Sequence, residues 1–382
     1  MRVSVHDEIA AIGQQEWNAV AGTDFPFLRH EFLLAAEQTG CVSETSGWLP
    51  CHLALRDDAG ALRGAMPLYE KQHSWGEFVF DWAWANAYER AGLNYYPKLV
   101  SAVPFTPAPS PRLLLADTSD TEAAGLLLQA AIDLAEERQC SSLHLLFPTA
   151  AEAEFLSRSG LKLRKDCQFH WHNNGYEDFD DFLRSFSSRK RKKARRDRRH
   201  VSEAGIRFRR LTGAALTPEV WRSVYPLIAH TFMQRGAMPY YSLAFFEQIS
   251  ALLGEQLLVV LAEDQHAAVA AAVFFVGKDV LYGRYWGSVG HYNSLHFETC
   301  YYQGIDYCIE HGIATFEPGT QGEHKVSRGF VPTTTYSAHW LKQAAFFDAI
   351  GNYVDEEGRH IERYMDAVDE HSPYRAKDKD TT

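Results

Sequence analysis

The hydrophobic residues of the chain follow helical and strand-like periods in turn. Apolar side chains at i, i+3, i+4 and i+7 from Phe179 to Phe186 predict a helix. Two longer amphipathic stretches predict further helices, and each leads into a short apolar strand. These helix and strand pairs are 121–139 with 143–147, and 297–311 with 313–316. The alternation predicts a mixed α/β protein.

The order of predicted elements repeats in the two halves of the chain. A strand, a polar turn and a second strand at 57–66 return at 264–273, an offset of 207 residues. Farther along the offset becomes 169, so the first half carries about 38 extra residues. The matching pairs at the second offset are Phe147 and Phe316, Glu154 and Glu323, Gly160 and Gly329, and His170-Trp171 and His339-Trp340.

The repeat predicts two α/β domains in tandem, each with a mixed sheet, because a chain of 382 residues is too long for one ordinary core. We place the first domain at 1–174, with an insert at about 75–111, and the second at 175–345. A helix and a tail at 346–382 follow.

The composition is that of a soluble globular protein, with 46% hydrophobic residues and a mean hydropathy of −0.30. No apolar window reaches the length of a membrane span, and the N-terminus enters no signal-like apolar region, so we expect a cytoplasmic location. Six scattered cysteines indicate reduced thiols. We expect no metal site, because on a strand Cys167 points to one face and His170 and His172 to the other.

A basic segment interrupts this acidic protein, whose net charge is −11. Residues 189–199 hold nine of the 38 Lys and Arg and one acid, Asp197. Ser187 or Ser188 would cap a helix here, and Gly205 would end it. Cations in the first turns oppose the helix dipole and repel one another, which favours an anionic partner with Arg191 and Arg195 among its contacts. A solvated helix face is the alternative.

The repeat also provides an internal control for locating a site. At the offset of 169, Phe155 and Leu156 of the first copy correspond to His324 and Lys325 of the second. Since packing alone is satisfied by apolar residues, the polar replacements point to a site around 321–328. Gln321, Lys325 and Arg328 would bind an anionic group there. An ordinary surface ion pair is the alternative.

A site for proton transfer needs a base, and three residues are candidates. His324 is the first choice because an imidazole can be neutral at pH 7. Glu323 is its neighbour, and Glu298 starts the helix at 297–311 together with His296, which we include among the binding residues. Plain helix capping is the alternative for Glu298. His339 matches His170 in the first copy and is therefore expected to be structural.

Several motifs resemble those of known transferases. The element order resembles the GNAT acyltransferase fold, and the basic helix ending in Glu-Ala-Gly-Ile206 is similar to a signature of FemAB-like proteins. More closely, the chain resembles the FemAB-related predicted N-acyltransferases, also called peptidogalycan biosynthesis/recognition proteins. The matching stretches are 81–88, 95–98, 102–107, 296–303 and 317–332.

This resemblance implies two tandem GNAT-like domains and transfer of an acyl or aminoacyl group to an amine. It implies acyl-CoA or aminoacyl-tRNA as the donor substrate, with no tightly bound cofactor. A small molecule or a cell-wall precursor would carry the acceptor amine. The GNAT phosphate loop is matched only in part: Arg284 and Gly287 fit, whereas Val289 stands where a small residue is expected.

The extra residues of the first half are rich in aromatic side chains and proline. Such loops are suited to form the wall of a ligand site, and we expect them to line an acceptor groove between the two domains. Filling of an irregular core is the alternative. The binding candidates here are Trp82, Trp84, Tyr88, Tyr95, Tyr96 and Lys98.

The sequence therefore leaves functions of different classes open. The first is an N-acyltransferase with its chemistry in the second half. The second is a non-catalytic protein that binds nucleic acid or another anionic ligand through the basic helix at 187–205. A degenerate GNAT scaffold for protein contacts is the third.

Overall fold

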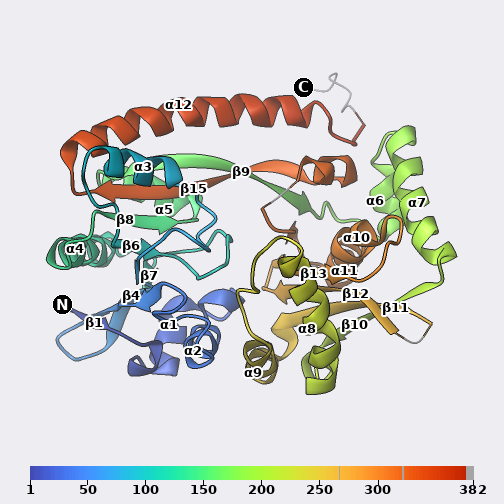
Figure 1. Cartoon of the computed structure of the whole chain (residues 1–382), viewed down its shortest axis with the longest axis horizontal. Helices are drawn as coiled ribbons and strands as arrows, with labels where there is room; N and C mark the ends of the chain where they lie inside the picture. Colours follow the sequence, from blue (N-terminus) through green and yellow to red (C-terminus); the bar gives the residue numbers. More distant parts are fainter. Residues whose placement is uncertain (266, 321, 376–382) are drawn as a thin grey trace. The chain divides into compact units, whose positions relative to one another are not determined.

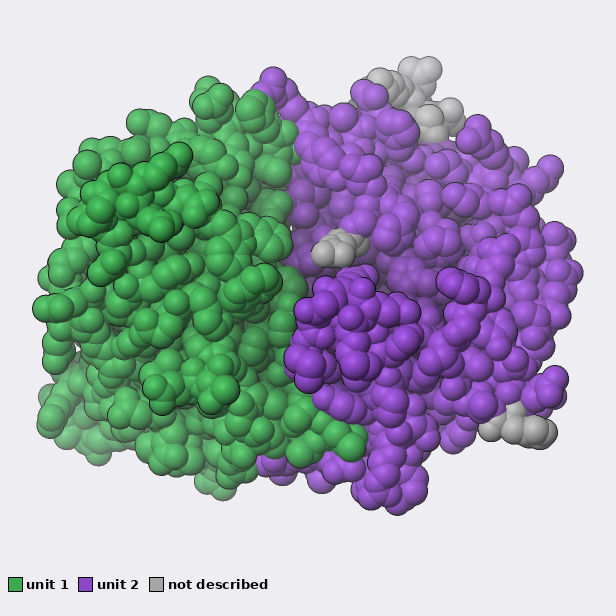
Figure 2. Space-filling model, viewed as in Figure 1, with its two compact units in different colours: residues 1–166, 240–245, 334–362 green, residues 167–239, 246–333, 363–382 purple. Residues whose placement is uncertain are grey.

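The computed structural model describes residues 1–265, 267–320 and 322–375, which form two compact units (Figure 2). Unit 1 contains 1–166, 240–245 and 334–362. The remaining described residues form unit 2. Gln321, a predicted binding residue, lies outside the described part of the chain.

Unit 1 holds the N-terminal helices and strands (Figure 1). Its helices are α1 (Gln14–Ala21), α2 (His30–Gln38), α3 (Trp82–Arg90), α4 (Thr121–Glu137) and α5 (Ala150–Arg158), with 3-10 turns at Ile9–Ala11 and Pro26–Leu28. Its strands are β1 (Arg2–His6), β2 (Trp48–Pro50), β3 (His52–Arg56), β4 (Leu62–Met66), β5 (Tyr69–Lys71), β6 (Lys98–Ser101), β7 (Leu114–Leu115) and β8 (Ser142–Leu146).

Unit 2 holds most of the C-terminal elements. Its helices are α6 (Phe179–Arg184), α7 (Ser188–Glu203), α8 (Pro218–Met233), α10 (Leu295–Phe297) and α11 (Gln303–His311), with 3-10 turns η3 (Gly213–Ala215), η4 (Gly254–Gln256) and η6 (Glu323–Arg328) and a π-helical turn η5 (Glu298–Tyr302). Its strands are β10 (Ile206–Thr212), β11 (Leu257–Asp264), β12 (Ala267–Val276), β13 (Val280–Ser288) and β14 (Thr315–Glu317). Four elements contribute residues to both units: β9 (Lys162–His172), α9 (Leu243–Leu253), β15 (Val331–Leu341) and α12 (Ala344–Asp369).

The two units contain sheets of the same mixed type, which confirms the predicted α/β class. In unit 1 the strand order is β15-β8-β6-β5-β2, with β6 parallel to β8. In unit 2 the order is β10-β11-β12-β13-β14-β9, with β13 parallel to β14 and the other neighbouring pairs antiparallel. Unit 1 also has a four-stranded sheet in the order β1-β3-β4-β7.

In each half of the chain, the end of the last strand belongs to the sheet of the other unit. The end of β9, from the first half, pairs with β14 in unit 2 through Trp171 and Phe316. In unit 1, β15 from the second half pairs with β8, so that His339 lies opposite His144. The units therefore differ from the predicted ranges 1–174 and 175–345, because pairing of these strands depends on partners distant in sequence.

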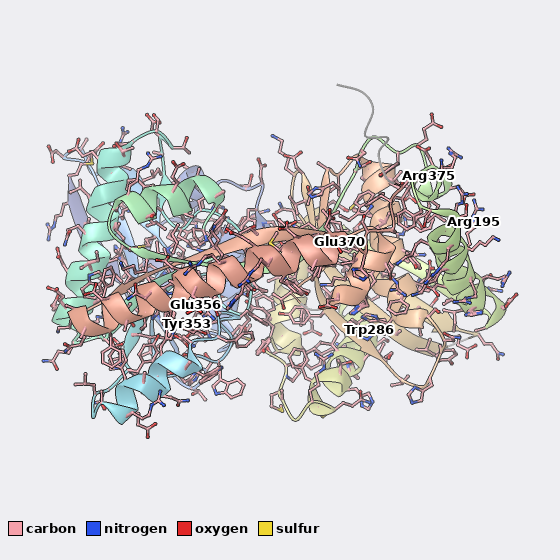
Figure 3. The ribbon with its side chains drawn as sticks, turned by 90° about the horizontal axis from the view of Figure 1, so that it is seen from above. Arg195, Trp286, Tyr353, Glu356, Glu370 and Arg375 are labelled. Carbon is pink, nitrogen blue, oxygen red and sulfur yellow. The ribbon has the colours of Figure 1, made fainter. Side chains whose placement is uncertain are left out.

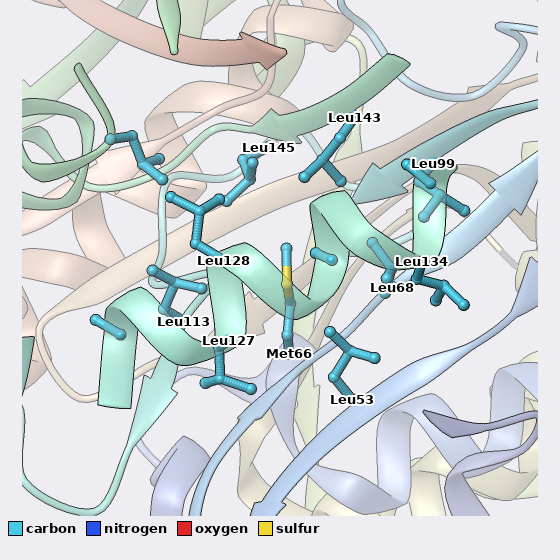
Figure 4. Packing of buried hydrophobic residues seen from close by; sticks show 14 of the residues in the cluster. Leu53, Met66, Leu68, Leu99, Leu113, Leu127, Leu128, Leu134, Leu143 and Leu145 are labelled. Carbon is cyan, nitrogen blue, oxygen red and sulfur yellow. The ribbon is translucent and has the colours of Figure 1, made fainter. Parts of the chain in front are cut away.

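The core of unit 1 lies between α4 and its strands (Figure 4). Leu127, Leu128 and Leu134 of α4 are buried against Leu53 and Leu143 of the sheets. The predicted helix at 121–139 and strand at 143–147 agree with α4 and β8 within a few residues. The predicted insert at 75–111, however, contains β6, a central strand of this sheet.

Residue Gly287 is a packing position in unit 2, although the sequence suggested a phosphate loop. It lies inside β13, where α8 comes so close that an added Cβ would be 2.0 Å from the carbonyl oxygen of Leu227. Because backbone atoms fill this space, the expectation of a ligand-binding role for Gly287 is corrected. Arg284 and Gly287 thus belong to strand β13, and Val289 and Gly290 follow its end.

This close approach generates a stability prediction. Gly287→Ala should lower the free energy of unfolding by about 1–3 kcal/mol, because the backbone of α8 or β13 must move. Gly125→Ala is the matched control: its Cβ would meet nothing within 4 Å inside α4. That change should raise stability by roughly 0.5–1 kcal/mol. Urea unfolding measures both, and equal effects would contradict the packing argument.

Candidate active site

The imidazole side chain of His324 is exposed to solvent in unit 2, at the start of η6. The preceding Gly322 has φ +106°, and a Cβ there would lie 2.1 Å from the His324 ring. Glycine is thus required for the ring to fold back over the backbone. The Tyr301 hydroxyl lies 2.8 Å from His324 Nε2. The local sequence therefore holds an accessible imidazole in a defined position.

Aromatic rings surround this imidazole on its protein side. The ring centroids of His296 and Phe297 lie 5.9 Å from that of His324, and Trp286 packs against His296. Tyr301 comes from the π-helical turn η5, a type of irregularity that is frequent at functional sites. This turn directs Tyr301 toward His324 from a helix that is otherwise regular.

Both imidazoles are neutral at pH 7. Burial lowers the pKa of His324, and the charges of Lys325 and Arg328 lower it further. Burial, together with His324 and nearby cations, lowers the pKa of His296 to about 4. A neutral imidazole can accept a proton, so His324 fits the predicted base.

The side chain of Arg328 supports η6 from inside the protein. It donates a hydrogen bond to the backbone oxygen of His324 over 2.8 Å and forms a buried ion pair with Asp197 of α7 at 3.1 Å. Its guanidinium also lies 3.2 Å from the ring centroid of Phe297. The prediction that Arg328 binds an external anion is therefore corrected: its anion is Asp197.

Residue Lys325 is buried beside a second ion pair. Its Nζ donates a hydrogen bond to the Gly319 oxygen at 2.5 Å, and only 1% of the residue is exposed. Arg284 and Glu317 pair at 2.8 Å on the neighbouring strands β13 and β14. Burial lowers the pKa of Lys325 to about 7, with Glu317 opposing and Arg284 reinforcing this shift. Lys325 and Arg284 thus form part of the interior, and neither is the exposed anion-binding arm that the sequence suggested.

Each of the two candidate carboxylates, Glu323 and Glu298, bonds to a partner other than Lys325 and Arg284. Glu323 is exposed on η6 and accepts a hydrogen bond from Tyr364 at 2.9 Å. Glu298 is buried and faces α7, where Arg198 pairs with it at 3.0 Å. Burial raises the pKa of Glu298, against the effect of Arg198. Glu298 therefore anchors α7 and is not assembled with His324 as an alternative base.

The basic helix α7 has an inner and an outer face. Ser187 occupies the N-cap position and Gly205 follows the helix with φ +76°, as predicted, although Ser187 makes no side-chain cap bond. Arg191 is half-buried. Arg195, labelled on α7 in Figure 3, is exposed and pairs with Asp180 at 3.0 Å. The ion pairs of Arg198 and Asp197 show that only part of the positive charge faces water.

The aromatic candidates of unit 1 mostly fill its core. Trp84, Tyr88 and Tyr95 are buried in a cluster with α12 residues, in agreement with the alternative interpretation, whereas Trp82 is 37% exposed. Tyr96 is half-buried and bonds to Ser74.

Lys98 is fully buried in unit 1, between two carboxylates. Its Nζ lies 2.8 Å from Glu77 and 2.5 Å from Asp81. Burial raises the pKa of Glu77 to about 7, although Lys98 opposes this effect. Lys98 therefore neutralises buried acids of its own unit, and the structure shows no exposed Lys98 amine for a ligand.

Four residues that the sequence did not single out are partners of His324, Lys325 or Lys98 in the structure. Tyr301, Glu317, Glu77 and Asp81 become recognisable only through their spatial partners. Asp197 carried a signal, because it is the single acid in the basic segment.

Two negative findings apply to the described residues. No group of three or more His, Cys, Asp or Glu could hold a metal ion there. None of the described helices is long and apolar enough to cross a membrane.

The Asp197–Arg328 pair predicts unequal effects for two acids that bind arginines of unit 2. Asp197→Ala leaves a buried, unpaired guanidinium and should cost about 3–5 kcal/mol of stability. Asp180→Ala removes an exposed pair and should cost less than about 1 kcal/mol. Chemical denaturation compares them, and similar small losses would show that the buried pair contributes little.

Burial of Lys325 predicts a pH-dependent stability difference. Between pH 7 and about 10 the unfolded chain holds the Lys325 proton and the folded protein does not, so stability rises with pH. Lys325→Met removes this contribution. Its stability relative to the wild type should therefore be most favourable at or below pH 7 and decline toward pH 10. Exposed Lys342→Met is the control, and a pH-independent difference for Lys325→Met would refute the argument.

Comparison with known proteins provides the family and the fold. A family model described as "Peptidogalycan biosysnthesis/recognition" (FemAB-like) matches residues 8–376. The structure of FemX is similar with a TM-score of 0.57 and 13% identity, covering 92% of this chain and 100% of that chain. L-PGS from Bacillus licheniformis gives a TM-score of 0.52 and 8% identity, covering 87% of this chain and 97% of that chain.

The structural likenesses establish a shared fold, since both identities are low. A search of curated protein sequences found no match. The family model spans nearly the whole chain, and the protein therefore belongs to the FemAB-like family.

Proposed function

We propose that the protein is an N-acyltransferase that moves an acyl or aminoacyl group from an activated ester or thioester to an amine. The single observation that carries this proposal is the exposed, neutral His324 imidazole held against Tyr301. Membership of the FemAB-like family supports transferase chemistry in a peptidoglycan-related context. The acceptor would accordingly be the amine of a cell-wall precursor or a related small molecule, and the reaction would take place in the cytoplasm.

The reaction can be balanced with these residues. An acceptor amine attacks the acyl carbon of the donor, forming a C–N bond, and His324 takes the proton that the nitrogen loses. With Nε2–H donated to the Tyr301 oxygen, Nδ1 keeps the lone pair that this step needs. The C–O or C–S bond to the leaving group then breaks, and the imidazolium returns its proton to that group.

The donor is either a CoA thioester or the ester of an aminoacyl-tRNA. The position of Arg284 and Gly287 within β13, with Arg284 paired to Glu317, removes the main sequence argument for a CoA phosphate loop. An RNA-borne ester requires no such loop, and the exposed cations of α7 supply positive charge. These points favour aminoacyl-tRNA, which would be a substrate and not a bound cofactor.

A second function rests on the outer face of α7. A protein without catalytic activity could bind nucleic acid through these cations alone. In that case substitutions at His324 would have no functional effect, whereas substitutions on α7 would abolish binding.

Substitution of His324 tests the proposal. His324→Gln should lower turnover by roughly 10²–10⁴-fold, because it removes the base. The folded state should persist, since the side chain is exposed. Turnover is measured as release of CoA or deacylated tRNA across a panel of donors with amine acceptors. The wild-type rate should fall in acid with a midpoint below 6.5, because the pKa of His324 is lowered.

The exposed His311 of the same unit offers a matched control. His311→Gln should retain wild-type turnover. Equal rates and equal pH profiles for wild type and His324→Gln would rule out the base role.

A further inference from the structure

We propose that the outer face of α7 is a docking surface for the phosphate backbone of duplex RNA. This inference rests on the proposed function, because it assigns the docking site of an RNA that carries the acyl group. The inference is based on four exposed cations: Arg189, Lys192, Lys193 and Arg196.

These four side chains form one stripe. Their positions i, i+3, i+4 and i+7 place them on the same side of the helix, over about 10 Å of its length. Among the described residues none of the four pairs with a carboxylate, whereas Arg195 pairs with Asp180. The first turn of α7 contains no acid either. The stripe thus maintains mutual repulsion that a polyanion would relieve.

The number of cations in the stripe can be compared with the number of phosphates along a duplex of the same length. A double helix carries one negative charge per about 1.7 Å of its axis with both strands counted, so a 10 Å length holds roughly six phosphates, enough to supply partners for four cations. The charge balance of the units is also unequal. Unit 1 has 15 Lys and Arg against 27 Asp and Glu, while unit 2 has 23 against 22. A polyanion is therefore attracted to α7 and repelled by unit 1.

The composition of the outer face argues against two other partners, a membrane surface and a single-stranded nucleic acid. A helix that lies on a membrane needs Trp, Phe or Leu to enter the lipid. Here the only apolar residues of α7 are Ala194 and Val201, and both are buried against the protein. Binding of single strands uses aromatic stacking, and α7 has no Phe, Tyr or Trp; its one histidine, His200, lies outside the stripe. An exposed row of cations instead fits backbone contacts across the wide, shallow minor groove of A-form RNA.

The inner face of α7 contacts the segment that carries the candidate base His324. Asp197 pairs with Arg328, which in turn supports the backbone of His324. A helix with its side chains is about 10–12 Å across. An RNA on the outer face would thus lie about one helix diameter from the residues that position His324.

RNA binding can be measured without turnover. The probe is a fluorescein-labelled 12-base-pair RNA hairpin, titrated by anisotropy at 50 and 200 mM KCl. Wild-type affinity should fall roughly 100-fold between these salt concentrations, as expected for about four phosphate contacts. The combined variant Arg189→Glu, Lys192→Glu, Lys193→Glu, Arg196→Glu should lose nearly all binding at 50 mM and most of the salt dependence.

A control variant makes the same change in net charge elsewhere. It carries Arg63→Glu, Arg90→Glu, Arg158→Glu and Arg207→Glu, all at exposed positions, and should retain wild-type affinity within about threefold, given the screening of distant charges. Circular dichroism and thermal unfolding should show both variants folded.

Several outcomes would overturn the inference. These are equal loss in the two variants, retained binding by the stripe variant, and tighter binding of single-stranded RNA, of the same hairpin in DNA, or of phosphatidylglycerol vesicles. Because the assay needs no turnover, failure here leaves the His324 proposal standing. Loss of turnover in His324→Gln with intact RNA binding would likewise separate the two.

Discussion

The buried ion pair between Asp197 and Arg328 joins helix α7 of unit 2 to the turn η6, which carries the candidate base His324. Asp197 belongs to α7, and Arg328 ends η6, more than 100 residues later. Removing two charges from water costs several kcal/mol, which ion pairing and hydrogen bonds offset. Tyr302 donates a hydrogen bond to Asp197, and Arg328 donates one to the His324 oxygen, while the buried Nε of Arg328 has no hydrogen-bond partner among the described residues. The basic helix can therefore not move without disturbing the segment that carries His324.

This connection changes the meaning of the basic segment. A run of nine cations suggests one continuous surface, yet α7 separates them by face. Arg198 turns inward to Glu298 and Asp306, whereas Arg189, Lys192 and Arg196 remain outside. The inner cations stabilise the helix through ion pairs. The outer ones are free to act on a partner, at a cost in repulsion along the helix.

Local patterns were sufficient to predict most of the helices and strands. The α4 and β8 ranges, the cap positions of α7 and the mixed sheet follow from period, capping and turn residues. The exchange of β9 and β15 between the units does not, because a strand has the same pattern whichever sheet it joins. Likewise, Arg284 and Lys325 have the composition of ligand-binding residues, and only their buried partner Glu317 shows that they belong to the interior.

The internal repeat was the most informative comparison, and the structure explains why. Leu156 is fully buried in the core of unit 1, and Lys325 at the matching position of unit 2 is equally buried. The position thus kept its burial while its chemistry changed from apolar to ionisable, and a pKa of about 7 records the cost. Packing gives no reason to accept that cost. The neighbouring change from half-buried Phe155 to exposed His324 places the imidazole in solvent beside it. Two adjacent replacements, both unfavourable or neutral for stability, are the reason why the proposed function places its chemistry in unit 2.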